Sequence, residues 1–397
     1  MGDADLGNLI IFAVVLALTA GLPALLPRLP VPGVVLEVLA GTVVGPQVLG
    51  WAHPGPVARF LSDFGLAVLF LMAGFEMDPA VMRGPPINRA LAGWLCSAVL
   101  ALAASLLLAA AGLAGAPALT ALTLTTTAIG TLMPVLRDGR LLGPPYGPFV
   151  LAAGAIGEAA PVIVLSLLLA RAYFGWQALI MLAFAAGATA AVLLAARARA
   201  GYLRALFART MHSSGQLPMR LALAIMILLV VLAERLNIDL VLGAFIAGAV
   251  MRAALGEDHR AHMAARLDGI GSAFVVPVFF IASGARLDVA ALFSDWRTLL
   301  MVPLYALLML LVRGLPAALL YRGALGPRQR ASLALHLGTQ ISLVVAITAI
   351  ATERGLMAGS QAAALVGGGV LTTMLYPEVA RRVLRAERAA APRLAPH

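Results

Sequence analysis

Charge is scarce in this sequence: only 12% of its 397 residues are Asp, Glu, Lys or Arg, roughly half the share found in water-soluble domains. Lysine is absent, so every basic residue is an arginine. The single cysteine, Cys96, excludes an intramolecular disulfide framework and a cysteine-based metal site. P-loop, dinucleotide-fingerprint, HExxH and GxSxG motifs are also absent, so we expect neither an enzyme nor a bound cofactor.

Apolar residues are abundant instead, at 62% of the chain with a mean hydropathy of +0.98. They come in long blocks, and about twenty apolar residues cross the hydrocarbon core of a bilayer as a helix. The sequence therefore predicts an all-α polytopic membrane protein with about thirteen transmembrane helices and no separate soluble domain. We place the spans near 6–27, 31–50, 60–81, 87–113, 117–136, 145–170, 174–196, 217–235, 239–255, 269–290, 297–321, 329–351 and 359–380.

The net charge of +10 follows the predicted loops and does not indicate a nucleic-acid partner. Most arginines fall on one side of the membrane when alternate loops are compared, in the loops 197–220 and 252–266 and in the tail from Arg381 to Arg393. The positive-inside rule makes that side cytoplasmic. We therefore expect the N-terminus, with Asp3 and Asp5, outside and the C-terminus in the cytoplasm.

Glu158 is the clearest ionisable residue inside a predicted span, near the middle of 145–170 and one turn before Pro161. An ionisable group at that depth is costly unless it is paired or faces water. A carboxyl in such a place is suited to proton exchange, so we favour a functional role. The alternative is a protonated glutamate bonded to a neighbouring helix.

Arg313 is the second charge placed within a span, about two turns from its cytoplasmic end. It either faces the protein interior or extends its long side chain to the interface. Other ionisable residues lie nearer to the ends of spans, where we expect solvated or helix-capping roles: Glu37, Glu76, Asp78 and His336.

Two predicted spans contain polar stretches that weaken a helix: LTLTTTAIGTLMP in the fifth and HLGTQISLVVAITAIAT in the twelfth. Threonine runs also form ordinary hydrogen-bonding surfaces between helices, which is the alternative explanation. Each stretch lies in the middle helix of a three-helix unit, and the two units begin in opposite directions across the membrane. Interrupted helices at corresponding places in two inverted halves are typical of a transporter binding site.

Several segments together resemble one transporter family. They are VPGVVLEVLAGTVVGPQVLG at 31–50, SDFGLAVLFLMAGFEMD at 62–78, the stretch from TTTAIGTLMP to LAAGAIGEAAPVIVL, and the later LVLGAFIAGAVM and VPVFFIASGARLD. On these motifs the chain resembles the membrane domain of Kef-type and related bacterial antiporters, the monovalent cation:proton antiporter-2 family. The resemblance covers nearly the whole chain, without the C-terminal nucleotide-binding domain of Kef-type systems.

The resemblance implies the sodium/proton antiporter fold, in which two inverted repeats bring together two crossed discontinuous helices. The core repeats would be 87–170 and 297–385, the scaffold and dimerisation helices mainly 6–81 and 174–290, and the cytoplasmic tail 386–397. It also implies a homodimer in the bacterial inner (plasma) membrane, surrounded by lipid.

Site residues follow from the same resemblance. Glu158 falls on the ion-binding carboxylate, and Arg313 falls where relatives carry a basic residue, often lysine, that compensates charge. The remaining residues are assigned to the two discontinuous helices: Thr125, Thr126 and Thr127 in the first, and Thr339, Gln340 and Ser342 in the second.

Two motifs depart from the family pattern. Relatives commonly carry two adjacent polar or acidic residues at the carboxylate, such as Asp-Asp or Asn-Asp, whereas this chain has Gly157 and Glu158. In the twelfth span it has Gly338-Thr339-Gln340 where many relatives have an Arg/Gly-Gly-Glu-Phe-like element. Both departures bear on ion preference.

The sequence therefore predicts a secondary transporter that exchanges protons for a monovalent cation, Na⁺ or K⁺, by alternating access. One carboxylate and one arginine of fixed charge predict electroneutral exchange, with Glu158 as the shared site. The alternative is a non-transporting sensor or assembly protein with a structural Glu158–Arg313 pair. Transport of an organic solute on the same fold is a third possibility.

Overall fold

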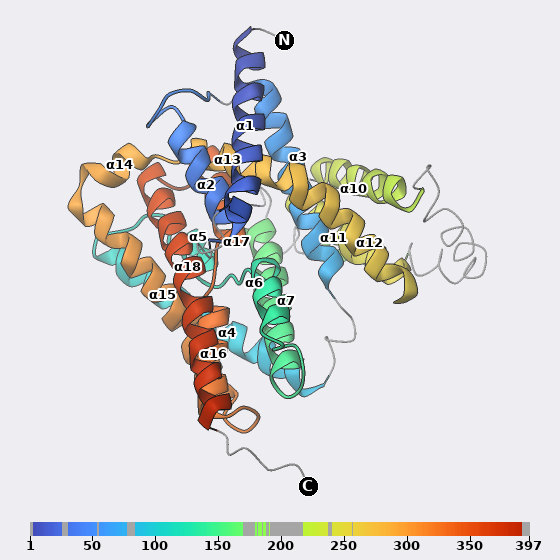
Figure 1. The fold of residues 1–397 in the computed structure, drawn as a ribbon, viewed down its shortest axis with the longest axis vertical. Helices are drawn as coiled ribbons and strands as arrows, with labels where there is room; N and C mark the ends of the chain where they lie inside the picture. Colours follow the sequence, from blue (N-terminus) through green and yellow to red (C-terminus); the bar gives the residue numbers. More distant parts are fainter. Residues whose placement is uncertain are drawn as a thin grey trace. The chain divides into compact units, whose positions relative to one another are not determined.

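The fold is helical throughout the described part of the chain. The computed structural model describes residues 3–25, 31–53, 55–77, 84–169, 217–236, 240–255 and 257–390, with short pieces between 179 and 190. Every element named in these ranges is a helix (Figure 1). Within them, seven helices are long and apolar enough to cross a membrane, and four shorter apolar helices accompany them. The chain is a multi-pass membrane protein, as its composition predicts.

Helices occupy nearly all of the predicted spans. The continuous ones are α1 (Asp3–Leu25), α2 (Gly33–Val44), α3 (Pro56–Glu76), α4 (Pro85–Ala110), α7 (Tyr146–Leu169), α10 (Leu217–Arg235), α11 (Leu240–Ala254), α15 (Trp296–Leu320) and α18 (Gly359–Ala390). The span predicted at 269–290 is built from α12 (Glu257–Ile270), the π-helical turn Gly271–Val275 and α13 (Val276–Ala285), and the short α14 (Val289–Ser294) follows. The span predicted at 174–196 falls mostly outside the described residues.

Chain contacts divide the protein into two compact units, the first of which comprises residues 1–16, 52–80 and 162–282. Within it, α3 and α10 both pack against α11. A Cβ atom on Gly74 would collide with the carbonyl oxygen of Phe245, and one on Gly248 with that of Leu71. Small residues let membrane helices approach until their backbones touch. The motif at 240–251 and the described part of the motif at 62–78, residues 62–77, are therefore packing motifs of this unit.

The second unit comprises residues 17–51, 81–161 and 283–397 and contains both interrupted helices. The first interruption separates α5 (Pro117–Leu124) from α6 (Ile129–Asp138), and the second separates α16 (Pro327–Leu337) from α17 (Ser342–Glu353). Both breaks were predicted from the sequence and are confirmed. Around them α4 and α17 pack on α5, while α15, α16 and α18 pack on one another. All the predicted site residues belong to this unit.

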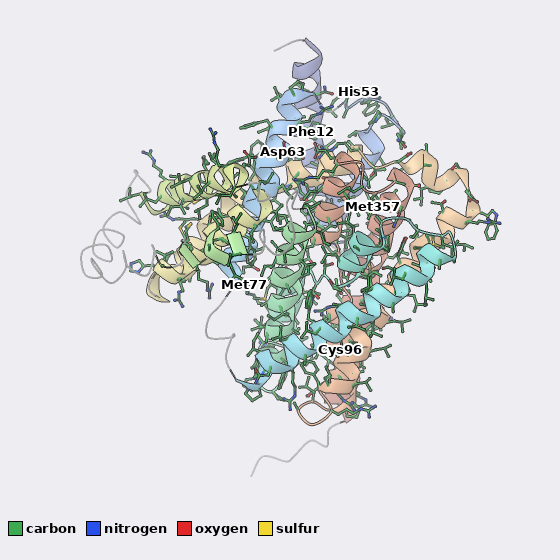
Figure 2. All side chains as sticks on the ribbon, turned by 180° about the vertical axis from the view of Figure 1, so that it is seen from behind. Phe12, His53, Asp63, Met77, Cys96 and Met357 are labelled. Carbon is green, nitrogen blue, oxygen red and sulfur yellow. The ribbon has the colours of Figure 1, made fainter. Side chains whose placement is uncertain are left out.

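The helix α4 shows how side chains partition on a membrane helix. Its exposed face carries Leu95, Val99 and Leu106, whereas Ser97 and Ser105 are fully buried. The Ser97 hydroxyl donates to the carbonyl of Gly93 in its own helix at 2.9 Å. Cys96 lies on the exposed side of α4 (Figure 2). Apolar side chains cover the outside because the surrounding solvent is lipid.

Candidate functional site

The two interruptions meet through their backbones. The N–H of Ala128, in the first break, donates to the carbonyl oxygen of Thr339, in the second, at 3.1 Å. Irregular backbone within a membrane must find hydrogen-bond partners in the protein or in a water-filled cavity. Each break here supplies a hydrogen-bond partner to the other. We call the place where the two breaks meet, residues 125–128 and 338–341, the crossing.

Side chains from the two breaks cap each other's helices. The final carbonyl of α5, on Leu124, accepts a hydrogen bond from Gln340 Nε2 at 3.1 Å. The final carbonyl of α16, on Leu337, accepts one from the Thr127 hydroxyl, also at 3.1 Å. Thr127 and Gln340 each stand three positions after the helix end that precedes them. The arrangement is reciprocal, and it satisfies carbonyls that a helix terminus otherwise leaves open.

Gln340 joins further parts of the unit. Its Oε1 lies 3.2 Å from the Thr126 hydroxyl, and its backbone N–H donates to the Thr372 hydroxyl on α18 at 3.2 Å. A Cβ atom on Gly369 would come within 2.6 Å of the Gln340 carbonyl oxygen. The glycine-rich segment 365–373 therefore packs closely against the second break.

Glu158 belongs to α7, and its side chain reaches the N-terminus of α6. Its side chain is only 8% exposed, and Oε1 accepts a hydrogen bond at 2.9 Å from the backbone N–H of Ile129, the first residue of that helix. The N-terminus of a helix carries partial positive charge and unsatisfied N–H groups. The first break thus directs a helix N-terminus at the one carboxylate that the sequence places deep within a span.

Arg313 faces the protein interior and does not extend to the interface. Its side chain is 3% exposed. Nε and Nη2 donate to the Thr127 hydroxyl oxygen at 3.1 and 2.9 Å, and Nη2 also donates to the carbonyl of Ala153 at 3.1 Å. These bonds connect the guanidinium to the first break and to α7, rather than directly to the Glu158 carboxylate. Thr127 therefore links Arg313 on α15 to the carbonyl of Leu337 on α16.

Gly157 explains how the guanidinium fits. A Cβ atom at this position would lie 2.6 Å from both Arg313 Nη2 and the Thr127 hydroxyl oxygen. The Gly157 carbonyl also accepts a hydrogen bond from the Thr127 N–H at 3.0 Å. Space that a side chain at position 157 would need is filled by Arg313 and Thr127. The glycine that replaces the first polar residue of the family motif thus makes room for the side chain of Arg313 on α15.

Three other predicted site residues are placed less centrally. Thr125 and Thr339 are buried, and their hydroxyls donate to Leu122 and Leu335 in the preceding helical turns, at 2.7 and 3.1 Å. Ser342 is the half-buried first residue of α17. In the described part of the chain, Ser342 takes no part in the hydrogen bonds of the crossing.

The expectation for His336 is wrong. Its side chain is completely buried on α16, with Nδ1 at 2.7 Å from the Tyr146 hydroxyl and 3.4 Å from that of Ser332. It lies near the end of its predicted span, but Tyr146 at the start of α7 covers it. Tyr146 is distant from His336 in the sequence, so the residues around His336 give no sign of this burial. The hydrogen bond between the Gln340 N–H and the Thr372 hydroxyl was missed for the same reason. Asp78 lies outside the described residues.

The chemistry of the crossing suits a small cation of single charge or a proton. It combines one buried carboxylate with threonine hydroxyls and carbonyls of broken helices, which are oxygen donors used for Na⁺ and H⁺ in transporters. Across the described ranges, no group of three or more His, Cys, Asp or Glu side chains is arranged to hold a metal ion.

Comparisons with known proteins agree with this architecture. A family model described as "Sodium/hydrogen exchanger, transmembrane" matches residues 14–385. The chain is 26% identical to the putative Na(+)/H(+) antiporter YjbQ of Bacillus subtilis, over 98% of this chain and 64% of that protein. It is 24% identical to the Na(+)/H(+)-K(+) antiporter GerN of Bacillus cereus, over 88% and 89% of the two chains.

A solved structure supports the fold independently. The sodium proton antiporter MjNhaP1 from Methanocaldococcus jannaschii, determined at pH 8, superposes with a TM-score of 0.67 at 17% sequence identity. The match covers 97% of this chain and 98% of that one. The chain spans only about two-thirds of the length of the B. subtilis relative but nearly all of this solved structure.

Proposed function

Because the chain belongs to the sodium/hydrogen exchanger family, we propose that it is a secondary transporter that exchanges protons for a monovalent cation, Na⁺ or K⁺. The shared binding site is Glu158, and transport occurs by alternating access of the crossing to the two sides of the membrane. The names of the relatives, which include Na⁺ and K⁺ exchangers, support this choice of cations. Within this family, we assign the chain to the monovalent cation:proton antiporter-2 branch. We also propose that the protein forms a homodimer in the bacterial inner membrane.

The observation that carries the proposal is the position of the Glu158 carboxylate. It is buried at the crossing and bonded to the N-terminus of α6. A charged carboxylate is costly to move through a low-dielectric barrier, whereas a carboxylate neutralised by a proton or a cation is much less so. Proton and cation therefore compete for one group, and only an occupied site changes sides. This competition couples the two fluxes.

Arg313 holds a fixed charge and geometry in this scheme. A guanidinium stays protonated in proteins, so Arg313 is not a proton carrier. Its bonds to Thr127 and Ala153 tie α15 to the first break and to α7. Since Thr127 lies two positions before Ile129, whose N–H binds Glu158, Arg313 fixes the segment that positions the carboxylate.

Flux in proteoliposomes tests the proposal. The purified protein is reconstituted with an internal pH-sensitive dye, and Na⁺, K⁺ or Li⁺ is added outside. In the wild type, entry of Na⁺ or K⁺ should drive protons out of the vesicles and raise the internal pH. Glu158→Gln should abolish this pH change, because the amide cannot exchange a proton. Cation-driven pH changes of wild-type size in Glu158→Gln would overturn the assignment of the site.

Stability measurements separate transport from a purely structural role. If Glu158 serves exchange, Glu158→Gln should unfold in detergent at a temperature close to that of the wild type, because a neutral amide is less costly to bury than a carboxylate. If the two charges form a structural pair, removing one typically costs about 3–5 kcal/mol. In that case Glu158→Gln is strongly destabilised, Arg313→Gln added to it restores stability, and the wild type shows no flux with any alkali cation.

A further inference from the structure

Pro161 disturbs the regular hydrogen bonding of α7 beside the candidate site. It lies inside this helix, three positions after Glu158, and it is buried in the second unit. Proline has no backbone N–H, so the carbonyl four positions earlier loses its helical partner, and the proline ring pushes that carbonyl away from the helix. In α7 this carbonyl belongs to Gly157. A membrane helix tolerates proline where another group satisfies the freed carbonyl.

The first break occupies the freed carbonyl. The N–H of Thr127 donates to the Gly157 carbonyl oxygen at 3.0 Å. Residues 125–128 carry four N–H groups, of which two bond back to α5 and one, on Ala128, reaches the second break. The Thr127 N–H is the remaining one, and its bond to Gly157 is the main-chain contact that ties the first break to α7.

Two adjacent residues of α7 therefore hold the segment that leads into α6. Gly157 accepts a hydrogen bond from the Thr127 N–H through its carbonyl, and Glu158 accepts one from the Ile129 N–H through its side chain at 2.9 Å. The two donors stand only two positions apart in the chain. The Thr127 bond thus limits how far the Ile129 N–H can move from the carboxylate.

The second break is held by a different kind of acceptor. The N–H of Gln340, which stands three positions after its helix end as Thr127 does, donates to the Thr372 hydroxyl on α18 at 3.2 Å. A side chain at position 157 of α7 has no room to supply such a hydroxyl, because Arg313 and Thr127 fill the space beside Gly157. A main-chain carbonyl serves there instead, and a proline one turn later makes it available.

We propose that Pro161 is a positioning residue for cation exchange: it frees the Gly157 carbonyl to hold the first break, so that the Ile129 N–H stays on Glu158. The inference rests on the proposed exchange function and adds to it a residue outside the crossing. Proline is the least favourable residue in a helix interior and alanine the most favourable. Proline at this buried position therefore lowers the stability of α7 and improves the geometry of the site.

Hydrogen exchange tests the contact without requiring transport. In Pro161→Ala the new N–H pairs the Gly157 carbonyl into the helix and competes with Thr127 for it. Mass spectrometry of the purified protein in detergent should then show deuterium uptake about five times faster in the peptide that covers residues 125–128, as expected for one weakened hydrogen bond. The unfolding temperature should not fall, because alanine is the better helix former. Unchanged protection of this peptide overturns the proposal.

Flux kinetics test the positioning role. When the break is held less firmly, the Glu158 carboxylate has to be ordered as the cation binds, and such ordering lowers affinity. Pro161→Ala should therefore raise the KM for Na⁺ or K⁺ about fivefold, while the maximal rate at saturating cation stays nearly the same. Faster hydrogen exchange with an unchanged KM overturns the positioning role, since Pro161 would then support the helix without acting on the site.

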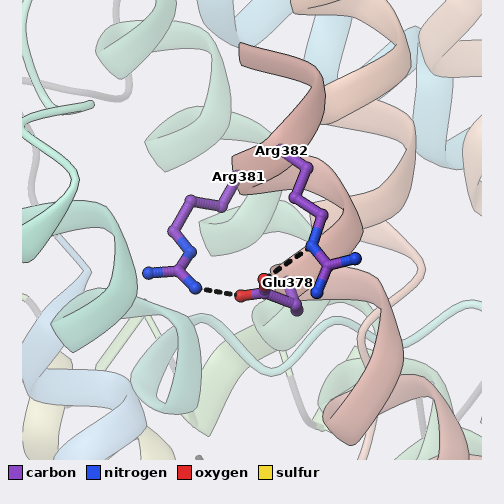
Figure 3. A network of polar contacts seen from close by, with 3 residues as sticks. All are labelled: Glu378, Arg381 and Arg382. Carbon is purple, nitrogen blue, oxygen red and sulfur yellow. Dashed lines mark hydrogen bonds and ion pairs between the residues drawn. The ribbon is translucent and has the colours of Figure 1, made fainter. Parts of the chain in front are cut away.

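Pro377 provides the matched control. It is a buried proline inside α18, and the carbonyl that it frees belongs to Thr373. Among the described residues, no backbone N–H from outside α18 donates to that carbonyl. The charged residues that follow Pro377 also bond within α18, where Glu378 binds Arg381 and Arg382 (Figure 3). Pro377→Ala should therefore leave the KM and the protection of the first break unchanged. Effects as large as those of the α7 substitution overturn the proposal.

The α-hydroxy analogue of alanine separates the missing N–H from the proline ring. Lactic acid, incorporated at position 161 by nonsense suppression, has the side chain of alanine but, like proline, no N–H. Its KM for the cation should lie closer to that of the wild type than to that of Pro161→Ala. A KM equal to that of Pro161→Ala would show that the free carbonyl is not what matters, and would overturn the proposal.

The proposed function and the role of Pro161 fail in different ways. If no cation drives proton flux in the wild type, the exchange function falls and the positioning role falls with it, while hydrogen exchange still decides whether the contact of the break with α7 depends on proline. If flux is present and depends on Glu158 while Pro161→Ala keeps the wild-type KM, only the role of Pro161 falls.

Discussion

At the scale of single residues, Gly157 and Arg313 are geometrically coupled. A Cβ atom at 157 would come 2.6 Å from Arg313 Nη2, so Gly157→Ala must push the guanidinium away from Thr127. We expect a loss of about 1–3 kcal/mol in stability, typical of overpacking, together with a large loss of flux. Thermal unfolding in detergent and proteoliposome flux measure the two effects.

Gly130→Ala is the matched control for that substitution. Gly130 lies in α6, close in sequence to the site, and nothing lies within 4 Å of a Cβ placed there. Alanine in a helix is more favourable than glycine by up to about 1 kcal/mol, so this variant should keep or gain stability. If Gly157→Ala also unfolds at the wild-type temperature, the close fit around Arg313 is contradicted.

At the scale of helices, the reciprocal caps of the crossing should stabilise it. Gln340→Leu leaves the Leu124 carbonyl without its amide donor, and Thr127→Val leaves the Leu337 carbonyl without its hydroxyl donor. Gln340→Leu should cost about 1–3 kcal/mol, the usual penalty for a buried polar group that loses its partner. Thr127→Val should cost more, because it also removes the oxygen that accepts two hydrogen bonds from the buried Arg313. The double variant should lose less than the sum, because both caps belong to one network. Additive losses in chemical unfolding would argue against that network.

The helices also show how far sequence analysis reaches. Both breaks were predicted, because TTTAIG and LGTQ are poor helix formers within apolar spans. The positions of Glu158 and Arg313 within the membrane were predicted from their distances, in residues, to the ends of their spans. The caps made by Thr127 and Gln340, the burial of His336 and the fit at Gly157 were not predicted. Each depends on a segment more than a hundred positions away or on a side-chain volume on another helix, and neither leaves a periodic signal.

At the scale of the whole molecule, the distribution of arginine predicts the orientation. The N-terminus should lie outside and the C-terminus in the cytoplasm, because the arginine-rich loops and the tail share one side. Reporter fusions at the two ends should therefore indicate different compartments. Two ends in the same compartment would mean that the number of spans is even, and that the count of about thirteen is wrong.

Transport by the whole protein should be electroneutral, with one proton exchanged for one cation. Glu158 is the carboxylate of the crossing, and Arg313 keeps a fixed charge throughout the cycle. A membrane potential then does no work on the exchange. A valinomycin-induced potassium potential should leave Na⁺-driven proton flux unchanged, and acceleration or reversal of that flux by the potential would contradict this stoichiometry.

The central claim is that proton and cation compete for the Glu158 carboxylate. Its most direct test is the pH dependence of the KM for the cation, measured in proteoliposomes with both sides at the same starting pH. Competition predicts that KM rises as pH falls, approaching about tenfold per pH unit once protons occupy most sites, while the maximal rate at saturating cation stays nearly constant. A KM that is the same at every pH, with only the maximal rate titrating, would show that proton and cation bind at separate groups and would contradict the account.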